Sequence, residues 1–173
     1  MDAQEKPEFR LVREANFAGT SLSAEQKEFV MNSEHSITST FSIHPIGFIH
    51  SELKQRSEAP RQGMEGAPNA WLEVSARFAE GLQGISPGQK LIVITWLHAA
   101  ARDTLKVHPC GDLNSPLTGV FSTRSPDRPN PLGLHRVTVR EIVGNRIRIG
   151  PIEAIDGTPV ADIKPVLTEA TDS

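Results

Sequence analysis

The chain has 173 residues, of which 38% are hydrophobic and 23% are charged, a composition that is ordinary for one globular domain with room for an appendage. The formal net charge of −3 excludes a protein held on nucleic acid mainly by its overall field, so any RNA contact must be local. Cys110 is the only cysteine, which excludes an intrachain disulfide and a cysteine-cluster metal site and fits a reducing cytoplasm.

The N-terminal quarter differs in composition from the rest. Residues 1–13 are polar and mixed in charge, and no stretch of the chain approaches the roughly 18 to 20 apolar residues of a membrane span, so we expect a protein that is neither secreted nor embedded. Residues 1–40 are rich in Ser, Thr, Glu and Asn and are predicted to form an appendage. Within it, Ser23 and Gln26 have capping-box spacing, which predicts a short helix over 24–31.

From residue 41 the pattern changes to short apolar or alternating runs, which are typical of strands. Gly144-Asn145 separates two alternating runs and predicts a hairpin, while one brief helical segment is expected over 78–82. The chain is therefore predicted to be mainly β: a small antiparallel β-barrel, closed or nearly closed, over residues 41–168 with a tail at 169–173. The predicted strands are 41–50, 72–78, 90–98, 117–122, 134–143, 146–149 and 160–163.

The segment 118–134 combines three prolines with two arginines. Pro126, Pro129 and Pro131 each fix φ and remove a backbone donor, so little of 124–134 is expected to be helix or central strand. A stiff loop loses little entropy when a ligand binds, and arginine and asparagine side chains suit anions and the edges of amides or bases. The alternative is a rigid surface connector whose charges are simply solvated.

Five motifs follow one another along the chain: Ile46–Ser51, Pro60–Gln62, Trp96–His98, the string Thr-Arg-Ser-Pro-x-Arg-Pro-Asn-Pro-x-Gly-Leu at 123–134, and Asp156–Pro165. Their order and spacing resemble the TsaA-like family, which includes the tRNA methyltransferases called TrmO. The resemblance runs from about residue 43 to 167, and the string at 123–134 is its most specific part. It implies a small β-barrel enzyme that binds S-adenosyl-L-methionine without a Rossmann domain, usually as a homodimer with the cofactor near the subunit interface.

The resemblance also implies which residues contact the cofactor. Arg124 is expected to bind the carboxylate of the amino-acid tail, and Asp156 to pair with the tail ammonium or a ribose hydroxyl. Residues 61–70 are irregular enough to order as a lid, and Asp162 and Lys164 are second choices. No metal is predicted, because the six histidines are scattered. The implied cofactor residues are Pro60, Arg61, Gln62, His98, Ala99, Arg124, Leu134, Asp156, Gly157, Thr158 and Pro159.

The leading hypothesis for the acceptor is N6 of a threonylcarbamoyl-modified adenine in a tRNA anticodon loop. Methyl transfer demands no strong base, so no catalytic residue is assigned. Two alternatives stay open: a methyltransferase for a small molecule or another RNA, and a non-catalytic cofactor-binding module that meets a protein partner through residues 1–40. Candidate RNA contacts are Arg128, Asn130, Arg102, Lys106 and Arg136, of which the first two either face the acceptor or hold the loop in shape.

Three departures from the family pattern weaken the tRNA hypothesis more than the cofactor hypothesis. Residues 81–90 replace a more aromatic segment, and residues 99–114 form a variant stretch. The chain ends at Ser173, where bacterial members often carry a further tRNA-holding domain. We therefore expect cofactor binding more strongly than tRNA specificity.

Overall fold

The computed structural model describes residues 9–10 and 42–167, and the chain divides into two units, Met1–His44 and Pro45–Ser173. In the first unit, β1 (Phe9–Arg10) pairs antiparallel with β2 (Ser42–Ile43). The helix predicted over 24–31 lies outside the described residues. Among the described helices, none is long and apolar enough to cross a membrane.

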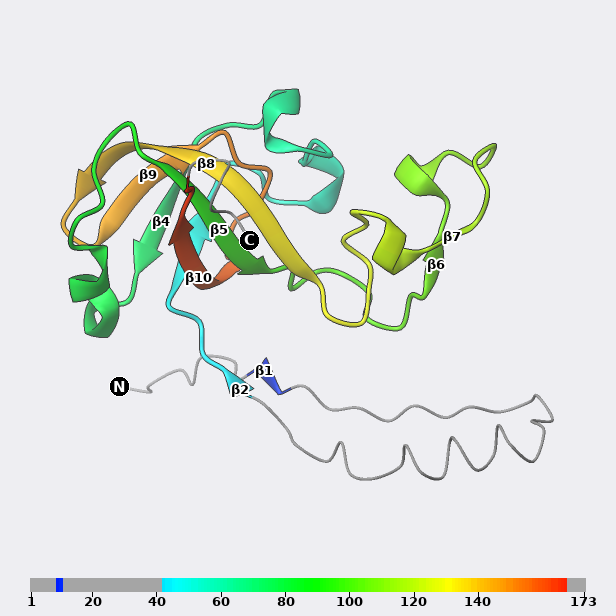
Figure 1. Ribbon diagram of the computed structural model, residues 1–173, viewed down its shortest axis with the longest axis horizontal. Coiled ribbons are helices and arrows are strands. Elements are labelled where there is room, and N and C mark those ends of the chain that lie inside the picture. The colour runs from blue at the N-terminus through cyan, green and yellow to red at the C-terminus, as the bar shows by residue number, and fades with distance from the viewer. Residues whose placement is uncertain (1–8, 11–41, 168–173) are drawn as a thin grey trace. The chain divides into compact units, whose positions relative to one another are not determined.

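Six antiparallel strands of the second unit close into a barrel in the order β10-β3-β4-β9-β8-β5 (Figure 1). Every neighbour in this ring is antiparallel, so the prediction of a mainly β fold with a small closed barrel is confirmed. The predicted turn at Gly144-Asn145 joins β8 to β9, and Gly144 has the positive φ of 59° that such a turn favours. The strands are β3 (Gly47–His50), β4 (Ala70–Val74), β5 (Lys90–Trp96), β8 (Leu132–Val143), β9 (Arg146–Gly150) and β10 (Pro159–Pro165).

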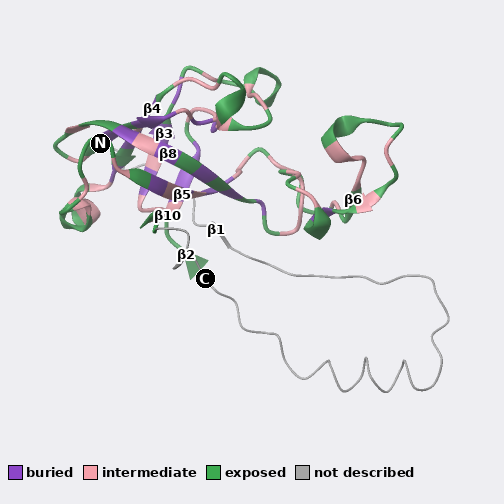
Figure 2. Ribbon diagram, turned by 45° about the horizontal axis from the view of Figure 1, so that its top comes forward, coloured by how far each residue is buried: buried purple, intermediate pink, exposed green. Residues whose placement is uncertain are grey.

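The barrel core follows the two-residue period of its strands. Along β8, Gly133, His135, Val137 and Val139 are buried, whereas the residues between them are exposed or half-buried. Figure 2 shows the buried positions gathered on the barrel strands. Branched aliphatic side chains fill most of the interior, and a polar pair, Thr95 and His135, lies among them.

The two ends of the barrel are closed differently. At the Trp96 end, where β5 ends and β8 and β10 begin, the β9–β10 connection buries Ile152 and Ala154 against the core. This connection, residues 151–158, is called the cap below. The long β3–β4 connection, with η1 (Arg56–Glu58) and η2 (Gly63–Glu65), also lies at this end. At the Lys90 end, η3 (Ala76–Leu82) packs Phe78 against the core.

Between β5 and β8 the chain leaves the barrel and forms a small arm, residues 102–123, which extends away from the barrel wall (Figure 1). Its two short strands pair antiparallel, Lys106 with Gly119 and Val107 with Thr118. Several large apolar side chains of the arm are exposed, which is unusual for a surface without a partner. The elements of the arm are β6 (Lys106–Val107), η4 (Pro109–Gly111), β7 (Thr118–Gly119) and η5 (Val120–Ser122).

The predicted strands 90–98, 134–143, 146–149 and 160–163 match β5, β8, β9 and β10 to within two residues at each end, whereas the other three differ more. The run 41–50 is divided into β2 and β3, because Pro45 has no N–H to donate to a ladder. The run 72–78 ends as strand at Val74, and the chain then turns into η3 as Phe78 N donates to Ser75 O. In the run 117–122 only Thr118–Gly119 is strand, and the remainder is η5. The helical segment expected over 78–82 lies within η3, a 3₁₀ helix.

Candidate functional site

The eleven residues that the family resemblance implies all lie on segments of the Trp96 end. Pro60–Gln62 precede η2, His98–Ala99 follow β5, and Asp156–Thr158 end the cap. Leu134 is on β8 with its side chain 55% exposed on the outside of the wall. None of them lines the open hollow of about 620 Å³ at the Lys90 end, so the predicted cofactor site is at the Trp96 end.

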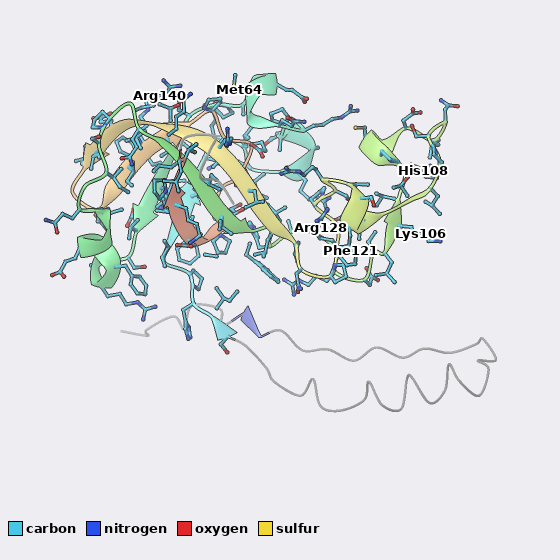
Figure 3. The ribbon with its side chains drawn as sticks, in the orientation of Figure 1. Met64, Lys106, His108, Phe121, Arg128 and Arg140 are labelled. Carbon is cyan, nitrogen blue, oxygen red and sulfur yellow. The ribbon has the colours of Figure 1, made fainter. Side chains whose placement is uncertain are left out.

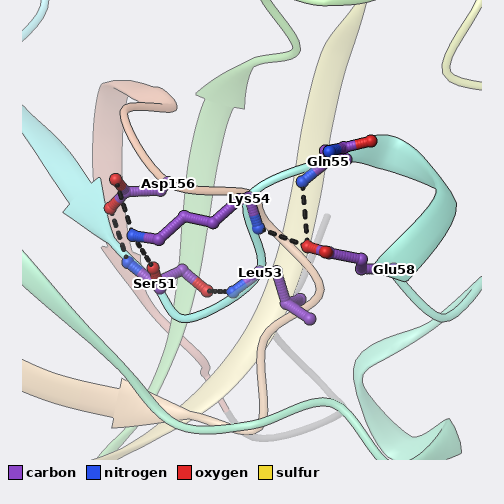
Figure 4. Close-up of polar contacts among 6 residues, drawn as sticks. All are labelled: Ser51, Leu53, Lys54, Gln55, Glu58 and Asp156. Atoms are coloured by element: carbon purple, nitrogen blue, oxygen red, sulfur yellow. Dashed lines mark hydrogen bonds and ion pairs between the residues drawn. The ribbon is translucent and has the colours of Figure 1, made fainter.

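Asp156 joins the cap to the chain that follows β3 (Figure 4). Its Oδ1 accepts a 2.9 Å hydrogen bond from Ser51 N, and its Oδ2 lies 2.9 Å from Lys54 Nζ. The hydrogen bond and charge of Lys54, helped by the Ser51 N–H and opposed by slight burial, lower the pKa of the Asp156 carboxyl below its ordinary value. Asp156, a predicted cofactor residue, therefore also holds Ser51 and Lys54 against the cap.

The segment 51–58, called the strap below, continues from Asp156 toward the base of the arm. Arg56 donates from one guanidinium nitrogen to Ala99 O at 3.1 Å and from another to Asp127 Oδ2 at 2.9 Å. Asp127 Oδ1 in turn accepts from Ala101 N at 2.8 Å. The strap thus connects three of the predicted segments, although no hydrogen bond or ion pair of the described chain joins the predicted residues directly to one another.

Sequence reasoning missed Lys54, Arg56 and Asp127. Asp127 lies inside the proline-rich loop, so its position was a usable signal, but its partners are 26 and 71 residues away in the chain. Arg56 lies in no motif at all. The pairing of distant charges depends on how the β3–β4 connection crosses the end of the barrel, which local sequence does not specify.

Arg128 is used to shape the loop. Its guanidinium donates to the carbonyl oxygens of Ser125, Val120 and Thr123 at 2.8, 2.9 and 2.6 Å, and its backbone N–H donates to Ala101 O at 3.0 Å. Figure 3 shows Arg128 where the arm meets the loop, with Lys106 farther out on the arm. Of the two roles left open for Arg128, the structure displays the loop-holding one, and an RNA contact stays a prediction.

Arg61 and Arg124 are different, because both are exposed and neither side chain has a hydrogen-bond or ion-pair partner within the described residues. His98 contributes a third unused group: its Nδ1 is buried without a hydrogen-bond partner there. Burial lowers the pKa of His98, so its imidazole is neutral at neutral pH. Two unpaired cations and a buried unpaired ring nitrogen suit a ligand that carries both an anionic group and hydrogen-bonding atoms.

The other candidate RNA contacts and the second-choice cofactor residues lie on the surface of the arm, the loop and the barrel. Arg102 lies over the Trp96 ring, 5.2 Å from its centroid, and Lys106 and Asn130 are exposed. Arg136 is exposed on the outer face of β8. Asp162 and Lys164 pair with each other at 2.8 Å on β10, which is hydrogen-bonded to β3 on one side and to β5 on the other. Within the described residues, no group of three His, Cys, Asp or Glu side chains could hold a metal ion.

Comparison with known proteins identifies the family. Residues 48–173 match the family described as the tRNA-methyltransferase O N-terminal domain. The chain belongs to this family. Similar proteins include an S-adenosyl-L-methionine-binding protein of Archaeoglobus fulgidus, 40% identical over 70% of this chain and 86% of that protein. One from Pyrococcus horikoshii, named as a probable S-adenosyl-L-methionine-binding protein, is 43% identical over 72% of this chain and 81% of its own length.

Solved structures give the same family. A crystal structure of TrmO from Pseudomonas aeruginosa aligns with a TM-score of 0.64 and 29% identity, covering 81% of this chain. The chain spans only 60% of the length of that TrmO chain. The aligned part is consistent with the barrel domain of the family. The remaining part of that TrmO chain has no counterpart in the alignment.

The Asp156 contacts generate a pH prediction. Because the folded-state pKa of Asp156 lies below the ordinary Asp value of 3.8, its contribution to stability is complete above that value and is lost as the pH falls through the lowered pKa. We expect the Asp156→Asn variant to lose less free energy of unfolding than the wild type when urea unfolding is compared between pH 7 and pH 3. Substitution of the exposed Asp103 by Asn is the control, and an identical acid loss in the Asp156 variant and the wild type would contradict the assignment.

Proposed function

We propose that this protein binds S-adenosyl-L-methionine at the Trp96 end of the barrel and transfers its methyl group to N6 of a threonylcarbamoyl-modified adenine in a tRNA anticodon loop. The observation that carries the proposal is that Arg61, Arg124 and His98 lie on three segments of the Trp96 end of a TrmO-family barrel, each with a polar group that has no side-chain partner within the described residues. The names of the similar proteins support the cofactor, and the family description supports tRNA as the class of acceptor.

The residues present fit the cofactor. S-adenosyl-L-methionine carries a carboxylate, a purine, a ribose diol and a sulfonium cation, so its site needs a cation, hydrogen-bonding groups and an apolar surface. Arg124 would hold the carboxylate, with Arg61 as a second cation, and His98 Nδ1 would gain the partner it lacks in the described chain. Leu132 and Leu134, 42% and 55% exposed, supply apolar surface on β8.

The chemistry places modest demands on the protein. When bound, the cofactor would supply an activated methyl group: the carbon–sulfur bond would break, with its electron pair left on sulfur, as the acceptor nitrogen bonds the methyl carbon and gives up its proton to solvent. The protein has to hold the acceptor in line and limit water, which needs fixed binding segments more than a strong base. The strap provides such fixing, since it ties the cap to the base of the arm through Asp156 and Arg56.

Exposed cations on the arm favour an RNA acceptor. A protein of net charge −3 must collect its phosphate contacts locally, and the arm and the loop beside it carry exposed cations. Bases of an anticodon loop are unstacked and can be splayed into a pocket, where aromatic or guanidinium faces stack on them. We infer a basic rim for RNA made of Arg102, Lys106, Asn130 and Arg136, with Arg128 holding the loop behind it.

The decisive experiment is mass spectrometry of tRNA nucleosides from a strain that lacks the gene. The proposal expects loss of the N6-methylated threonylcarbamoyl adenosine and its return when the gene is supplied. An unchanged nucleoside profile would reject tRNA as the acceptor. Cofactor turnover on another RNA or a small molecule would then select the second hypothesis, and cofactor binding without any transfer would select a cofactor-sensing module.

Cofactor binding by Arg124 is tested by calorimetry with S-adenosyl-L-methionine. We expect Arg124→Ala to weaken binding by about 1.5 to 3 kcal/mol, the usual worth of a hydrogen bond to a charged group. Arg77→Ala is the matched control, because Arg77 lies over Phe78 at the Lys90 end and should leave the affinity unchanged. Equal affinities of the wild type and a folded Arg124→Ala variant would remove Arg124 from the site.

The RNA rim is tested by the salt dependence of tRNA association. Three or four phosphate contacts to a single-stranded loop give a log–log slope of roughly −2 to −3, and Lys106→Ala should reduce its size by about 0.7. Lys106 is a better probe than Arg128, whose loss would also release three loop carbonyls. Lys90→Ala, at the opposite barrel end, should not change the slope, and binding that is indifferent to salt would exclude this rim.

We further propose a homodimer in which the arm contacts the second copy. Four large apolar side chains of the arm are 56% to 81% exposed: Leu105, Leu113, Leu117 and Phe121. Light scattering at micromolar concentration with cofactor present should give about twice the 18.9 kDa of the chain. A Leu113→Asp, Phe121→Asp double variant should shift the mass toward the monomer, and a monomeric wild type would refute the dimer.

A further inference from the structure

A polar chain of three side chains links two barrel strands to the cap at the Trp96 end and is used by none of the contacts described above. His135, only 4% exposed, has its Nε2 2.8 Å from Thr95 Oγ1 and its Nδ1 2.8 Å from Glu153 Oε1. Thr95 is fully buried, and the Glu153 side chain is 23% exposed. These three residues lie on β5, β8 and the cap, so the chain fixes the cap to two barrel strands.

The backbone of β8 packs closely against the Thr95–His135 pair at Gly133. A side chain at Gly133 would place its Cβ 2.5 Å from Thr95 Oγ1 and 2.6 Å from His135 Nε2, so only glycine fits above the pair. A neutral imidazole satisfies both neighbours when its Nδ1–H donates to the Glu153 carboxylate and the Thr95 hydroxyl donates to its Nε2. The imidazole is therefore held from both sides, and it holds the Glu153 carboxylate in turn.

The same carboxylate reaches the β3–β4 connection. The Gly63 backbone lies against Glu153, since a Cβ at Gly63 would be 3.1 Å from Glu153 Oε2 and 2.8 Å from Pro151 O, and the Gly63 N–H helps to lower the pKa of the Glu153 carboxyl. Gly63 O accepts in turn from Ala67 N at 3.1 Å, which extends the contact through η2. Burial opposes ionisation of Glu153, but the hydrogen bonds from His135 and Gly63 outweigh it, so the pKa of this carboxyl lies below its ordinary value of 4.5.

Gly63 follows Pro60-Arg61-Gln62 directly, so whatever fixes Gly63 also sets where Arg61 and Gln62 can reach. We propose that Glu153 is a positioning residue that holds the 60–66 segment on the cap for cofactor binding, with His135 and Thr95 aligning its carboxylate. The role rests on the proposed cofactor site, since it concerns the order of a segment of that site. Its chemistry is a charge-assisted hydrogen bond to a backbone N–H, the kind that orders a loop before a ligand arrives.

The first test needs no cofactor. Hydrogen–deuterium exchange of the free protein should be faster across residues 60–66 in Glu153→Ala and close to wild type in Glu153→Gln, because the amide oxygen of glutamine still accepts from Gly63 N–H. Glu65→Gln, an exposed substitution within η2, is the control and should leave exchange unchanged. Unchanged exchange at 60–66 in Glu153→Ala, or a rise of equal size throughout the barrel, would overturn the proposal.

The second test measures the dissociation constant for S-adenosyl-L-methionine. Glu153→Ala should raise it about tenfold or more, the range for loss of a hydrogen bond to a charged group, and Glu153→Gln should restore it to near wild type. If Glu153→Ala does not fold, Gly63→Ala opposes the same contact from the segment side and should give the same two effects. A wild type that does not bind the cofactor would refute the proposed function, whereas the exchange test would still decide the role of Glu153.

Discussion

Closure of the barrel by β10 is the constraint on which the rest of the structure depends. Val160 pairs with Gly47 of β3 and with Thr95 of β5, so a single strand completes the ring on both sides. Gly47 is required nearby, because a Cβ there would overlap the carbonyl oxygen of Glu73 on β4. Once the ring is closed there is no edge at which a ligand segment could pair, so binding must use the connections at the barrel ends. Closure of the ring thus brings the β3–β4 connection, the chain after β5, the proline-rich loop and the cap to one end of the barrel.

Charge pairs then link those connections to one another, in addition to the apolar burial of Ile152 and Ala154 on the cap. The strap carries Lys54 and Arg56, whose partners Asp156 and Asp127 lie on the cap and in the proline-rich loop. All four side chains are partly exposed, so each pair alone contributes little to stability. These pairs mainly restrict geometry, because a guanidinium or carboxylate that is hydrogen-bonded on two sides allows few positions of the backbone that carries it. A site that binds a flexible cofactor gains affinity from segments already placed.

The sequence predicted the parts of the structure that depend on local pattern. Alternation along 134–143 and 146–149, with Gly144-Asn145 between, was enough for the β8–β9 hairpin, and turn-separated strands were enough for a barrel. What failed was the prediction of strand bounds where a proline or a tight turn intervenes, as at Pro45 and Ser75. The strap, the cap and the Thr95–His135–Glu153 chain could not be predicted, because each joins residues that are remote in the chain and become neighbours only when the ring closes. The eleven cofactor residues were implied by resemblance and remain a prediction at the level of individual contacts.

The proline-rich loop shows how one short string serves two purposes. Arg128 and Arg124 are four residues apart, yet the first donates to three backbone carbonyls while the second has no partner within the described residues. The inward arginine replaces the backbone donors that the prolines removed, so a loop poor in N–H groups can still hold a fixed shape. Held in this way, it can present the outward arginine at a constant position without a helix or strand beneath it. A similar division occurs where the cap meets the β3–β4 connection: Glu153 is bonded to the buried His135, while Arg61, just before η2, is exposed. In both places a partly buried charged side chain contacts the segment that carries an exposed arginine, so it limits where that arginine can lie.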